Sequence, residues 1–167
     1  SSEVRVASLQ TSPPLTPQLS TLNSQLRFSV LICFEDIFPS LARRFVQQGA
    51  QWLVVITNDA WFGKTAAAYQ HAQASTLRAV ELRVPVVRAA NTGWSGCITE
   101  TGQRITSVRT SHGEELFVDG IAACEVAVER RPTVYQRFGD WFAILCLVIV
   151  PGFAIIQGRC RWTPTTS

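Results

Sequence analysis

The sequence predicts an α/β domain with a parallel sheet, and three features indicate it. Two runs, the mostly apolar residues 28–32 and the continuous apolar run 52–57, have the length and composition of buried strands. Between them, the stretch from Pro39 to Gln48 has helical spacing, and Gly49 follows as a stop signal. Strand, helix and strand in this order form a βαβ unit, so both strands should end at the same edge of the sheet.

Local signals place further elements before and after this unit. Val4–Leu9 roughly alternates apolar and polar residues ahead of a proline turn, which favours a short strand. Thr65–Leu82 has apolar residues on one helical face and ends just before a proline. A third parallel strand is expected at Pro85–Ala89.

A β-rich region follows the third strand. Ser95–Thr99 and Gln103–Val108 flank a Glu-Thr-Gly turn, which predicts a hairpin. Leu116–Val128 is also rich in β-forming residues, but Gly120 interrupts it. We therefore expect a bulge or bend at that glycine.

The C-terminal segment differs in character from the rest. Residues 141–156 contain no charged side chain, and residues 138–158 reach the roughly 20 residues that a bilayer crossing requires. We predict a transmembrane helix near residues 140–157, between a domain at 1–137 and a short tail at 159–167. The alternative is a buried core helix or strand. Arginines on both sides leave the orientation open.

The overall composition narrows the function classes. The 167 residues suffice for one domain with a proper core, and the net charge is only +3. The basic residues are arginines apart from Lys64, and no basic stripe interleaves with aromatic residues. Nucleic acid is therefore not an expected partner.

The five cysteines show no Cys-x-x-Cys pairing and no neighbouring histidine cluster, which argues against structural zinc. Their odd number also argues against a disulfide framework. The sequence leaves open whether Cys97 and Cys124 form a disulfide. We expect no metal and no cofactor.

Polar residues follow both apolar runs at the point where each predicted strand ends. Cys33 and Glu35 come after the first run, and Asn58 and Trp61 come after the second. Because the carboxyl ends of parallel strands meet at one edge, we expect these four side chains to be neighbours. The alternative for Cys33 is packing, since free cysteines are among the most buried residue types.

Three blocks of sequence carry a resemblance to a known family. Cys33–Asp36 is Cys-Phe-Glu-Asp, Thr57–Gly63 is Thr-Asn-Asp-Ala-Trp-Phe-Gly, and Arg78–Pro85 is Arg-Ala-Val-Glu-Leu-Arg-Val-Pro. In this order they resemble the nitrilase superfamily of carbon-nitrogen hydrolases, and within it the C-terminal part of the apolipoprotein N-acyltransferases. The resemblance covers about residue 30 to the C-terminus. It implies an incomplete nitrilase-type α-β-β-α sandwich followed by one C-terminal transmembrane helix.

The resemblance also implies an activity and a location. Cys33 would take an acyl chain from a phospholipid as a thioester and pass it to the N-terminal amine of a diacylglyceryl-cysteine lipoprotein. The backbone N–H of Phe34 would face the oxyanion. The partners would be phospholipid, lipoprotein and the bacterial inner membrane, with the catalytic domain on the periplasmic face.

The neighbouring residues have functional and structural interpretations. Glu35 could orient the acceptor amine or assist proton transfer; alternatively, it or Asp36 caps the helix that begins at Pro39. The candidate substrate-binding residues are Asn58, Trp61 and Phe62, and the alternative is loop architecture alone. Asn58 and Asp59 are expected to be mostly structural, and Trp61 is expected to touch the substrate. We expect His71 to be a solvated or capping histidine, not a base.

Two features of the family are missing. Its Glu-Lys-Cys set places the glutamate base and the oxyanion-stabilising lysine before the cysteine, whereas Thr11–Arg27 contains no Glu, Asp or Lys. The N-terminal bundle of membrane helices is missing too. We expect a catalytically incompetent fragment of a larger acyltransferase. The alternatives are a soluble carbon-nitrogen hydrolase and a non-catalytic, membrane-anchored remnant.

Overall fold

The computed structural model describes residues 26–127 and 131–161, in which five strands form one mixed sheet in chain order. The strands are β1 (Phe28–Ile32), β2 (Trp52–Asn58), β3 (Val86–Asn91), β4 (Gly96–Ile98) and β5 (Arg104–Ser107). The helices are α1 (Pro39–Gln47), α2 (Ala66–Leu82), α3 (Val134–Phe138) and α4 (Trp141–Arg161), with 3₁₀ turns η2 (Cys33–Ile37) and η3 (Ala60–Phe62). The strand expected at residues 4–9 lies outside the described residues.

The sheet topology confirms the predicted βαβ units. β1 pairs in parallel with β2, and β2 pairs in parallel with β3, so that Ile32, Ile56 and Ala89 lie side by side. β3, β4 and β5 continue the sheet in antiparallel fashion, which confirms the predicted hairpin. The carboxyl ends of the three parallel strands therefore lie at one edge.

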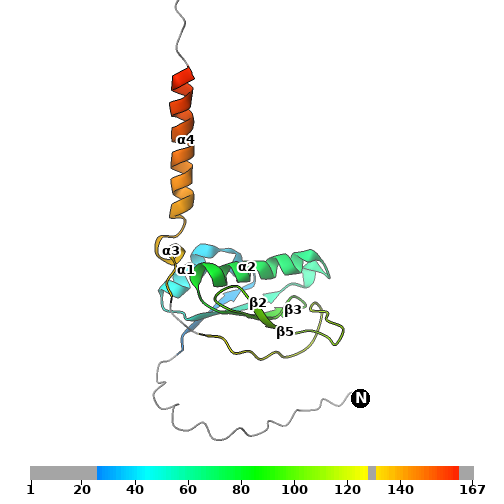
Figure 1. Ribbon diagram of the computed structural model, residues 1–167. Helices are drawn as coiled ribbons and strands as arrows, with labels where there is room; N and C mark the ends of the chain where they lie inside the picture. The colour runs from blue at the N-terminus through cyan, green and yellow to red at the C-terminus, as the bar shows by residue number, and fades with distance from the viewer. Residues whose placement is uncertain (1–25, 128–130, 162–167) are drawn as a thin grey trace, which may run out of the picture.

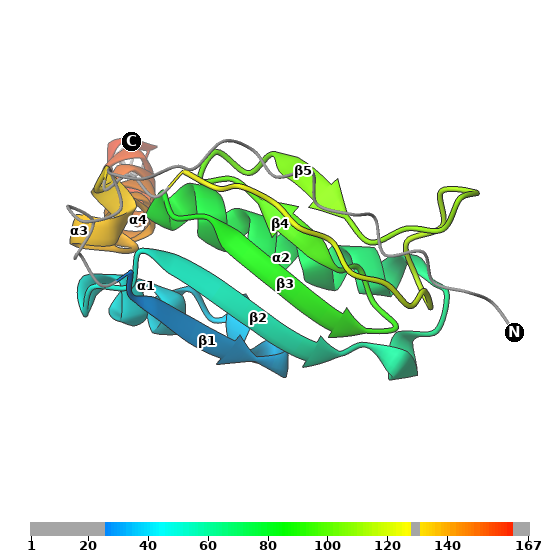
Figure 2. The same ribbon diagram turned by 90° about the horizontal axis from the view of Figure 1, so that it is seen from below.

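Helices α1 and α2 cover one face of the sheet (Figures 1 and 2). Alternate strand residues point toward them, and Leu31, Leu53 and Val55 are fully buried there. On the opposite face, Ile32 and Ile56 are more than half exposed. The described residues thus form one α-β half of a sandwich, with an open apolar face on the sheet.

Both covering helices begin and end close to the predicted residues. Pro39 is in the first turn of α1, where its missing N–H costs nothing. The Thr65 side chain caps α2 by accepting a hydrogen bond from the Ala67 N–H. Arg83 ends α2 in the left-handed conformation, at φ 51°.

The prediction of β structure at Leu116–Val128 is corrected by residues 108–127, here called the strap. They form no strand in the part that the structure describes, and bends fall at Leu116 and Phe117 rather than at Gly120. The strap crosses the open face of the sheet near β3 and β4 (Figure 2). A disulfide from Cys97 to Cys124 ties it to β4, which answers the question left open by sequence.

Reduction of this disulfide should destabilise the domain. The bond closes a loop with a sequence separation of 27 residues. A loop of that size corresponds to about 3–4 kcal/mol of unfolded-state entropy. We therefore expect Cys124→Ser to lower the free energy of unfolding by that amount in denaturant titrations. Reductant should produce the same loss in the unmodified chain and none in Cys124→Ser; an equal loss in both would place the effect elsewhere.

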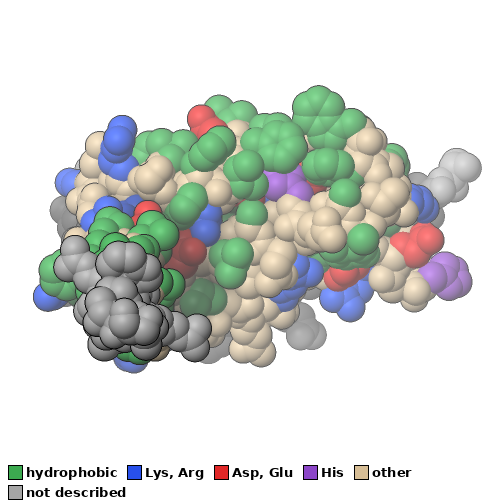
Figure 3. All heavy atoms as spheres, turned by 90° about the horizontal axis from the view of Figure 1, so that it is seen from above, with side chains coloured by type: hydrophobic (Ala, Val, Ile, Leu, Met, Phe, Trp, Pro, Cys, Tyr) green, Lys and Arg blue, Asp and Glu red, His purple; other side chains and the backbone are tan. Residues whose placement is uncertain are grey.

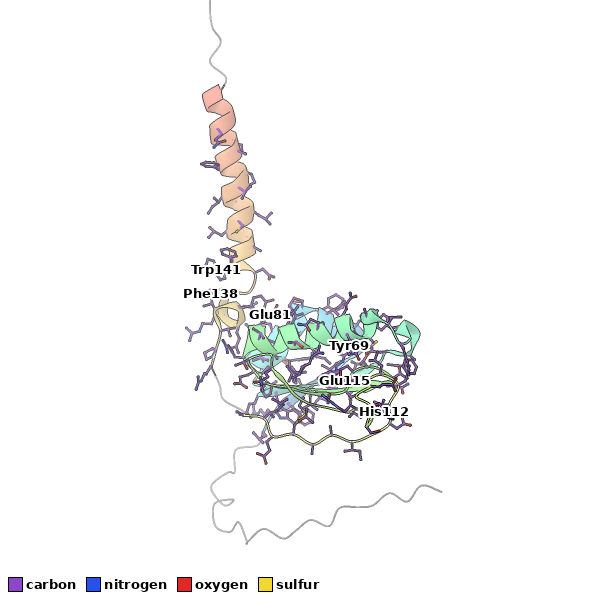
Figure 4. All side chains as sticks on the ribbon, turned by 45° about the vertical axis from the view of Figure 1, so that its right-hand side comes forward. Tyr69, Glu81, His112, Glu115, Phe138 and Trp141 are labelled. Carbon is purple, nitrogen blue, oxygen red and sulfur yellow. A yellow bond between two sulfur atoms is a disulfide. The ribbon has the colours of Figure 1, made fainter. Side chains whose placement is uncertain are left out.

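Short contacts fix α3 against the helix layer. The Arg43 guanidinium in α1 donates to the backbone carbonyls of Gln136 at 2.9 Å and Arg137 at 2.8 Å. The Thr133 hydroxyl donates to the Glu81 carbonyl near the end of α2. Figure 4 shows Glu81 near the base of α4, where Phe138 and Trp141 are also labelled.

Helix α4 confirms the predicted C-terminal helix and extends away from the sheet on the side of α1 and α2 (Figure 1). Its large apolar side chains are exposed from Phe142 to Ile155. Within residues 26–127 and 131–161, no helix has both the length and the apolar character of a membrane crossing. The transmembrane helix predicted near residues 140–157 is therefore not supported by the structure.

Candidate active site

Cys33 lies where the sequence predicts it, directly after β1 at the carboxyl edge of the parallel strands. It begins η2 with φ 54°, a left-handed conformation that is uncommon outside glycine. Its side chain is half-buried, which does not fit the alternative of a cysteine packed in the core. The sharp turn therefore ends the strand and leaves the thiol at the edge of the sheet.

Glu35 stabilises this turn from within. Its carboxylate accepts a hydrogen bond of 2.8 Å from the backbone N–H of Ile32, on the other side of Cys33. The alternative that Glu35 or Asp36 caps α1 is wrong, because Phe38 is the N-cap residue and makes no side-chain capping bond. Both carboxylates point toward other partners.

The loop after β2 lies beside the Cys33 turn. The Asn58 side chain accepts hydrogen bonds from the Ala60 N–H at 3.1 Å and the Asn91 amide at 3.3 Å. Asn58 thereby joins the ends of β2 and β3, which agrees with the expectation that it is mostly structural. Trp61 is 72% exposed and touches little of the core.

Phe34 joins the two loops through its ring. Its centroid lies 6.3 Å from that of Trp61 and 6.2 Å from that of Phe62. It also stacks on His71 of α2 at 4.8 Å. The structure therefore brings together the residue after the cysteine and the two aromatic candidates. Figure 3 shows hydrophobic side chains gathered on the face of the molecule that carries the helix layer.

Beneath this aromatic group lies a buried set of four charged residues, here called the charge cluster: Asp36, Asp59, His71 and Arg88. Asp36 Oδ1 is 3.0 Å from His71 Nε2, and its Oδ2 accepts from Arg88 at 2.7 Å. Ser75 also donates to Asp36 Oδ2, at 2.6 Å. Asp36 is thus fully paired despite complete burial, as a buried charge requires.

Asp59 closes the charge cluster from the other side. Its Oδ1 is 2.8 Å from His71 Nδ1 and accepts from the Thr57 hydroxyl at 3.1 Å. Its Oδ2 accepts from Arg88 at 3.1 Å. A side chain at Gly93 would overlap this carboxylate, so only glycine fits there. The expectation that Asp59 is structural agrees with these contacts.

The charge cluster favours a protonated His71. Hydrogen bonds to Asp36 and then Asp59 raise the pKa of His71 to about 9, against the opposing effects of burial and the Arg88 charge. Burial would raise the pKa of Asp59, but the hydrogen bond from His71 and the Arg88 charge hold it below its ordinary value. With His71 protonated, two cations balance two anions.

The protonation of His71 makes stability pH-dependent. The raised pKa means that the folded chain holds a proton that the unfolded chain loses above about pH 6.5. The stabilisation is therefore complete below pH 6.5 and is lost as pH rises to about 9. A difference of that size corresponds to about 3 kcal/mol. Urea titrations from pH 6 to pH 9.5 should show this fall in unfolding free energy.

Its control is His71→Gln, which has no group that titrates in this range. The variant should be less stable at pH 6, and its free energy of unfolding should be much flatter from pH 6 to pH 9.5. A slope that persists unchanged in His71→Gln would assign the pH dependence to another residue.

Arg78 ties the end of η2 to α2. Its guanidinium donates to the backbone carbonyls of Asp36 at 3.2 Å and Ile37 at 3.3 Å, and pairs with Glu81 at 2.8 Å. Lys64, by contrast, is 60% exposed and lies 3.8 Å from Glu114. Among the described residues, no group of three or more His, Cys, Asp or Glu side chains could hold a metal ion.

The comparison with protein families decides the relationship of this chain. The model for "Carbon-nitrogen hydrolase" matches residues 5–123, well over half of the sequence. The chain belongs to the carbon-nitrogen hydrolase family. This assignment confirms the resemblance drawn from the three sequence blocks. The fold it implies is the nitrilase-type α/β fold with a mixed sheet.

Curated relatives within this family carry a more specific name. An "Apolipoprotein N-acyltransferase" of Geobacter metallireducens is 44% identical over 135 residues, covering 78% of this chain and 23% of the relative. That of Thermotoga maritima is 36% identical, covering 72% of this chain and 23% of the relative. The chain thus spans about a quarter of the relatives it matches. A carbon-nitrogen hydrolase structure from Helicobacter pylori G27 aligns at a TM-score of 0.45 and 14% identity, covering 51% of this chain and 37% of that one.

His71 is the main residue that sequence reasoning misjudged. It was expected to be solvated or to cap a helix, yet it is only 6% exposed and pairs with two carboxylates. The sequence of this carbon-nitrogen hydrolase family member does contain a signal for the burial of His71. His71 and Ser75 are four residues apart, on the α2 face that also buries Ala68 and Ala72. A histidine on the apolar face of a helix needs buried partners.

Proposed function

We propose that this chain carries the nucleophile portion of an apolipoprotein N-acyltransferase site. The observation that carries the proposal is the left-handed turn that holds Cys33 half-buried at the carboxyl edge of the sheet, beside an aromatic loop. The names of the relatives support the choice of acyl transfer over other cysteine chemistry.

The reaction proceeds in two steps. The Cys33 thiolate attacks the ester carbonyl of a phospholipid acyl chain, and the tetrahedral intermediate collapses to a thioester as a protonated lysophospholipid leaves. The N-terminal amine of a diacylglyceryl-cysteine lipoprotein then attacks the thioester. An amide forms, the amine loses a proton, and the thiol is restored. The Phe34 N–H is the proposed oxyanion donor, and Glu35 is an accessory residue that orders the turn.

The aromatic loop supplies apolar area for an acyl chain. Trp61 is 72% exposed and Phe34 is 40% exposed, and both lie within reach of the thiol turn. Phe62 packs edge-on against Phe34 and sets its orientation. Asn58 shapes the loop through its hydrogen bonds to Ala60 and Asn91, so its proposed contribution to substrate binding is indirect.

We propose that the domain works at the periplasmic face of the bacterial inner membrane. The Cys97–Cys124 disulfide supports an oxidising compartment, because such bonds are rare in the cytosol. The exposed apolar side chains of α4 support a lipid environment next to the domain. A phospholipid donor requires the thiol to work at such a surface.

A chimera tests the proposed function. Residues 26–127 of this chain would replace the matching segment of the Geobacter metallireducens relative, which supplies the rest of the protein. We expect labelled phospholipid to acylate Cys33 as a thioester sensitive to hydroxylamine. The same chimera with Cys33→Ala should not label. A folded chimera without label at Cys33 would overturn the proposal.

A carbon-nitrogen hydrolase that releases product to water is the second candidate, and the matched family model favours it. The two reactions differ in the acceptor. If the same chimera released free carboxylic acid from amide substrates and left amine acceptors unmodified, the chain would be assigned to the hydrolases.

A further inference from the structure

We propose that His71 is a positioning residue that fixes the Cys33 turn and the Asn58–Phe62 loop relative to each other. This inference rests on the proposed function, because it takes Cys33 as the nucleophile and Phe34 as its oxyanion donor. His71 lies on α2, outside both loops, and contacts each of them through one ring nitrogen.

The two nitrogens of His71 reach different loops. Nε2 lies 3.0 Å from Asp36, three residues after Cys33 in the same turn. Nδ1 lies 2.8 Å from Asp59, the residue after Asn58. Arg88 also bridges both carboxylates, but it binds the other oxygen of each from the sheet side. Loss of His71 would therefore remove one hydrogen bond to Oδ1 of each carboxylate, while Thr57 and Ser75 keep their bonds to Asp59 and Asp36.

The ring of His71 also supports Phe34 directly. The two rings stack with centroids 4.8 Å apart and an interplanar angle of 30°. Phe62 packs edge-on against the same His71 ring at 5.9 Å. Because Phe34 follows the cysteine, the stack fixes the residue whose N–H would face the oxyanion.

His71 is placed for positioning and not for proton transfer. Both of its ring nitrogens face carboxylates, so neither is free to take a proton from the Cys33 thiol. The groups that face it are Asp36 from η2, Asp59 after β2, and Arg88 from β3. Asparagine or glutamine could replace only one of these two hydrogen bonds. Each has a single donor nitrogen, whereas the imidazolium ring has two that point in different directions.

The raised pKa of His71, about 9, supports the same inference. When the ring loses its proton, one of its two hydrogen bonds to the carboxylates is lost, and the net charge of the cluster becomes negative. Ser75 and Arg78 still tie the Cys33 turn to α2, and Arg88 lies 3.0 Å from Nδ1, so the change weakens the contact of His71 with one loop. The position of the two loops relative to each other should therefore depend on pH, as well as on the identity of residue 71.

A ratio of two reactions at Cys33 tests the positioning. Acylation by p-nitrophenyl butyrate passes through an oxyanion, whereas alkylation by iodoacetamide does not. Both need the thiolate, so their rate ratio cancels the ionisation of the thiol. Peptide-resolved mass spectrometry follows Cys33, with the exposed free thiol of Cys146 as the internal reference.

We expect the acylation-to-alkylation ratio at Cys33 to fall by about tenfold in His71→Gln and His71→Asn, since a displaced oxyanion donor loses part of its effect. The control is Val46→Ala, which removes a buried methyl pair at the far end of α1 and should leave the ratio unchanged. In the unmodified chain, the ratio should fall as pH rises through about 9. Circular dichroism would confirm that each sample is folded.

A ratio at Cys33 that stays constant with pH in the unmodified chain would overturn the positioning role, even if both His71 variants failed to fold. An equal ratio in Val46→Ala and the His71 variants would overturn it too. These outcomes are separate from the proposed function: a chimera that accepts no acyl chain, combined with a pH-dependent ratio, would overturn that function and leave the positioning intact.

Discussion

Arg88→Leu should lower the free energy of unfolding by about 3–5 kcal/mol, the cost of leaving buried carboxylates without their partner. Arg88 is 2% exposed and pairs with Asp36 at 2.7 Å and Asp59 at 3.1 Å. Its removal leaves two buried anions facing the single cation of His71. A loss of this size approaches the total stability of many domains of this length. Urea titration at pH 6.5, where His71 is protonated, measures it.

Arg44→Leu is the matched control, because Arg44 is exposed on α1 and the same substitution there should change stability by less than about 0.5 kcal/mol. Adding Asp59→Asn to Arg88→Leu removes one uncompensated charge and should recover part of the loss. If Arg88→Leu were as stable as Arg44→Leu, the charge cluster would contribute nothing to folding.

The main elements of the fold were predictable because their signals are local. β1 spans the predicted residues 28–32, and α2 begins one residue after the predicted start at Thr65. A continuous apolar run, a capping threonine and a proline after a helix each specify structure within a few residues. The parallel pairing of β1 and β2 follows from the helix between them.

The path of the strap could not be predicted from local sequence signals. Leu116–Val128 has the composition of a strand, yet residues 116–127 form no strand and the hydrogen-bonded sheet ends at β5. Its path depends on the bond between Cys97 and Cys124, and on the Phe117 N–H, which donates to the Thr92 carbonyl at 2.9 Å. Both are tertiary contacts, and β propensity records mainly how well a side chain fits a sheet that already exists.

The charge cluster was unpredictable for a related reason. Asp36 and Arg88 are 52 positions apart, and Asp59 and His71 come from two further elements. Each residue alone has an ordinary surface interpretation, and only the fold brings the four together. Cys33 could be proposed from sequence because its block of neighbours is specific, whereas the contacts beneath it became visible only in the structure.

The chain by itself should transfer no acyl chain from phospholipid to a lipoprotein amine above background. A nucleophilic thiol needs a base to form the thiolate near neutral pH, and no Glu or Asp lies in residues 11–27, where the family places that base. The missing lysine is an oxyanion donor, and loss of one such donor costs about 10²–10³ in rate. Both losses act on the same step.

We expect that Glu35, His71 and Lys64 do not replace the missing residues, because each has another partner. Glu35 accepts the Ile32 N–H at 2.8 Å and is engaged within its own turn. His71 has both nitrogens against carboxylates, and Lys64 faces Glu114 at 3.8 Å. Each of these contacts gives a candidate base or cation a partner other than the thiol.

The measurement compares three versions of this chain in detergent with phospholipid donor and a lipopeptide acceptor. The unmodified chain, Cys33→Ala and Glu35→Ala should all give the same background signal, although Glu35→Ala should be less stable because it frees the Ile32 N–H. Turnover that disappears in Cys33→Ala would contradict this expectation. It would mean that residues of this chain supply both the base and the oxyanion donor, and Glu35→Gln and Lys64→Gln would then show which of the two residues acts.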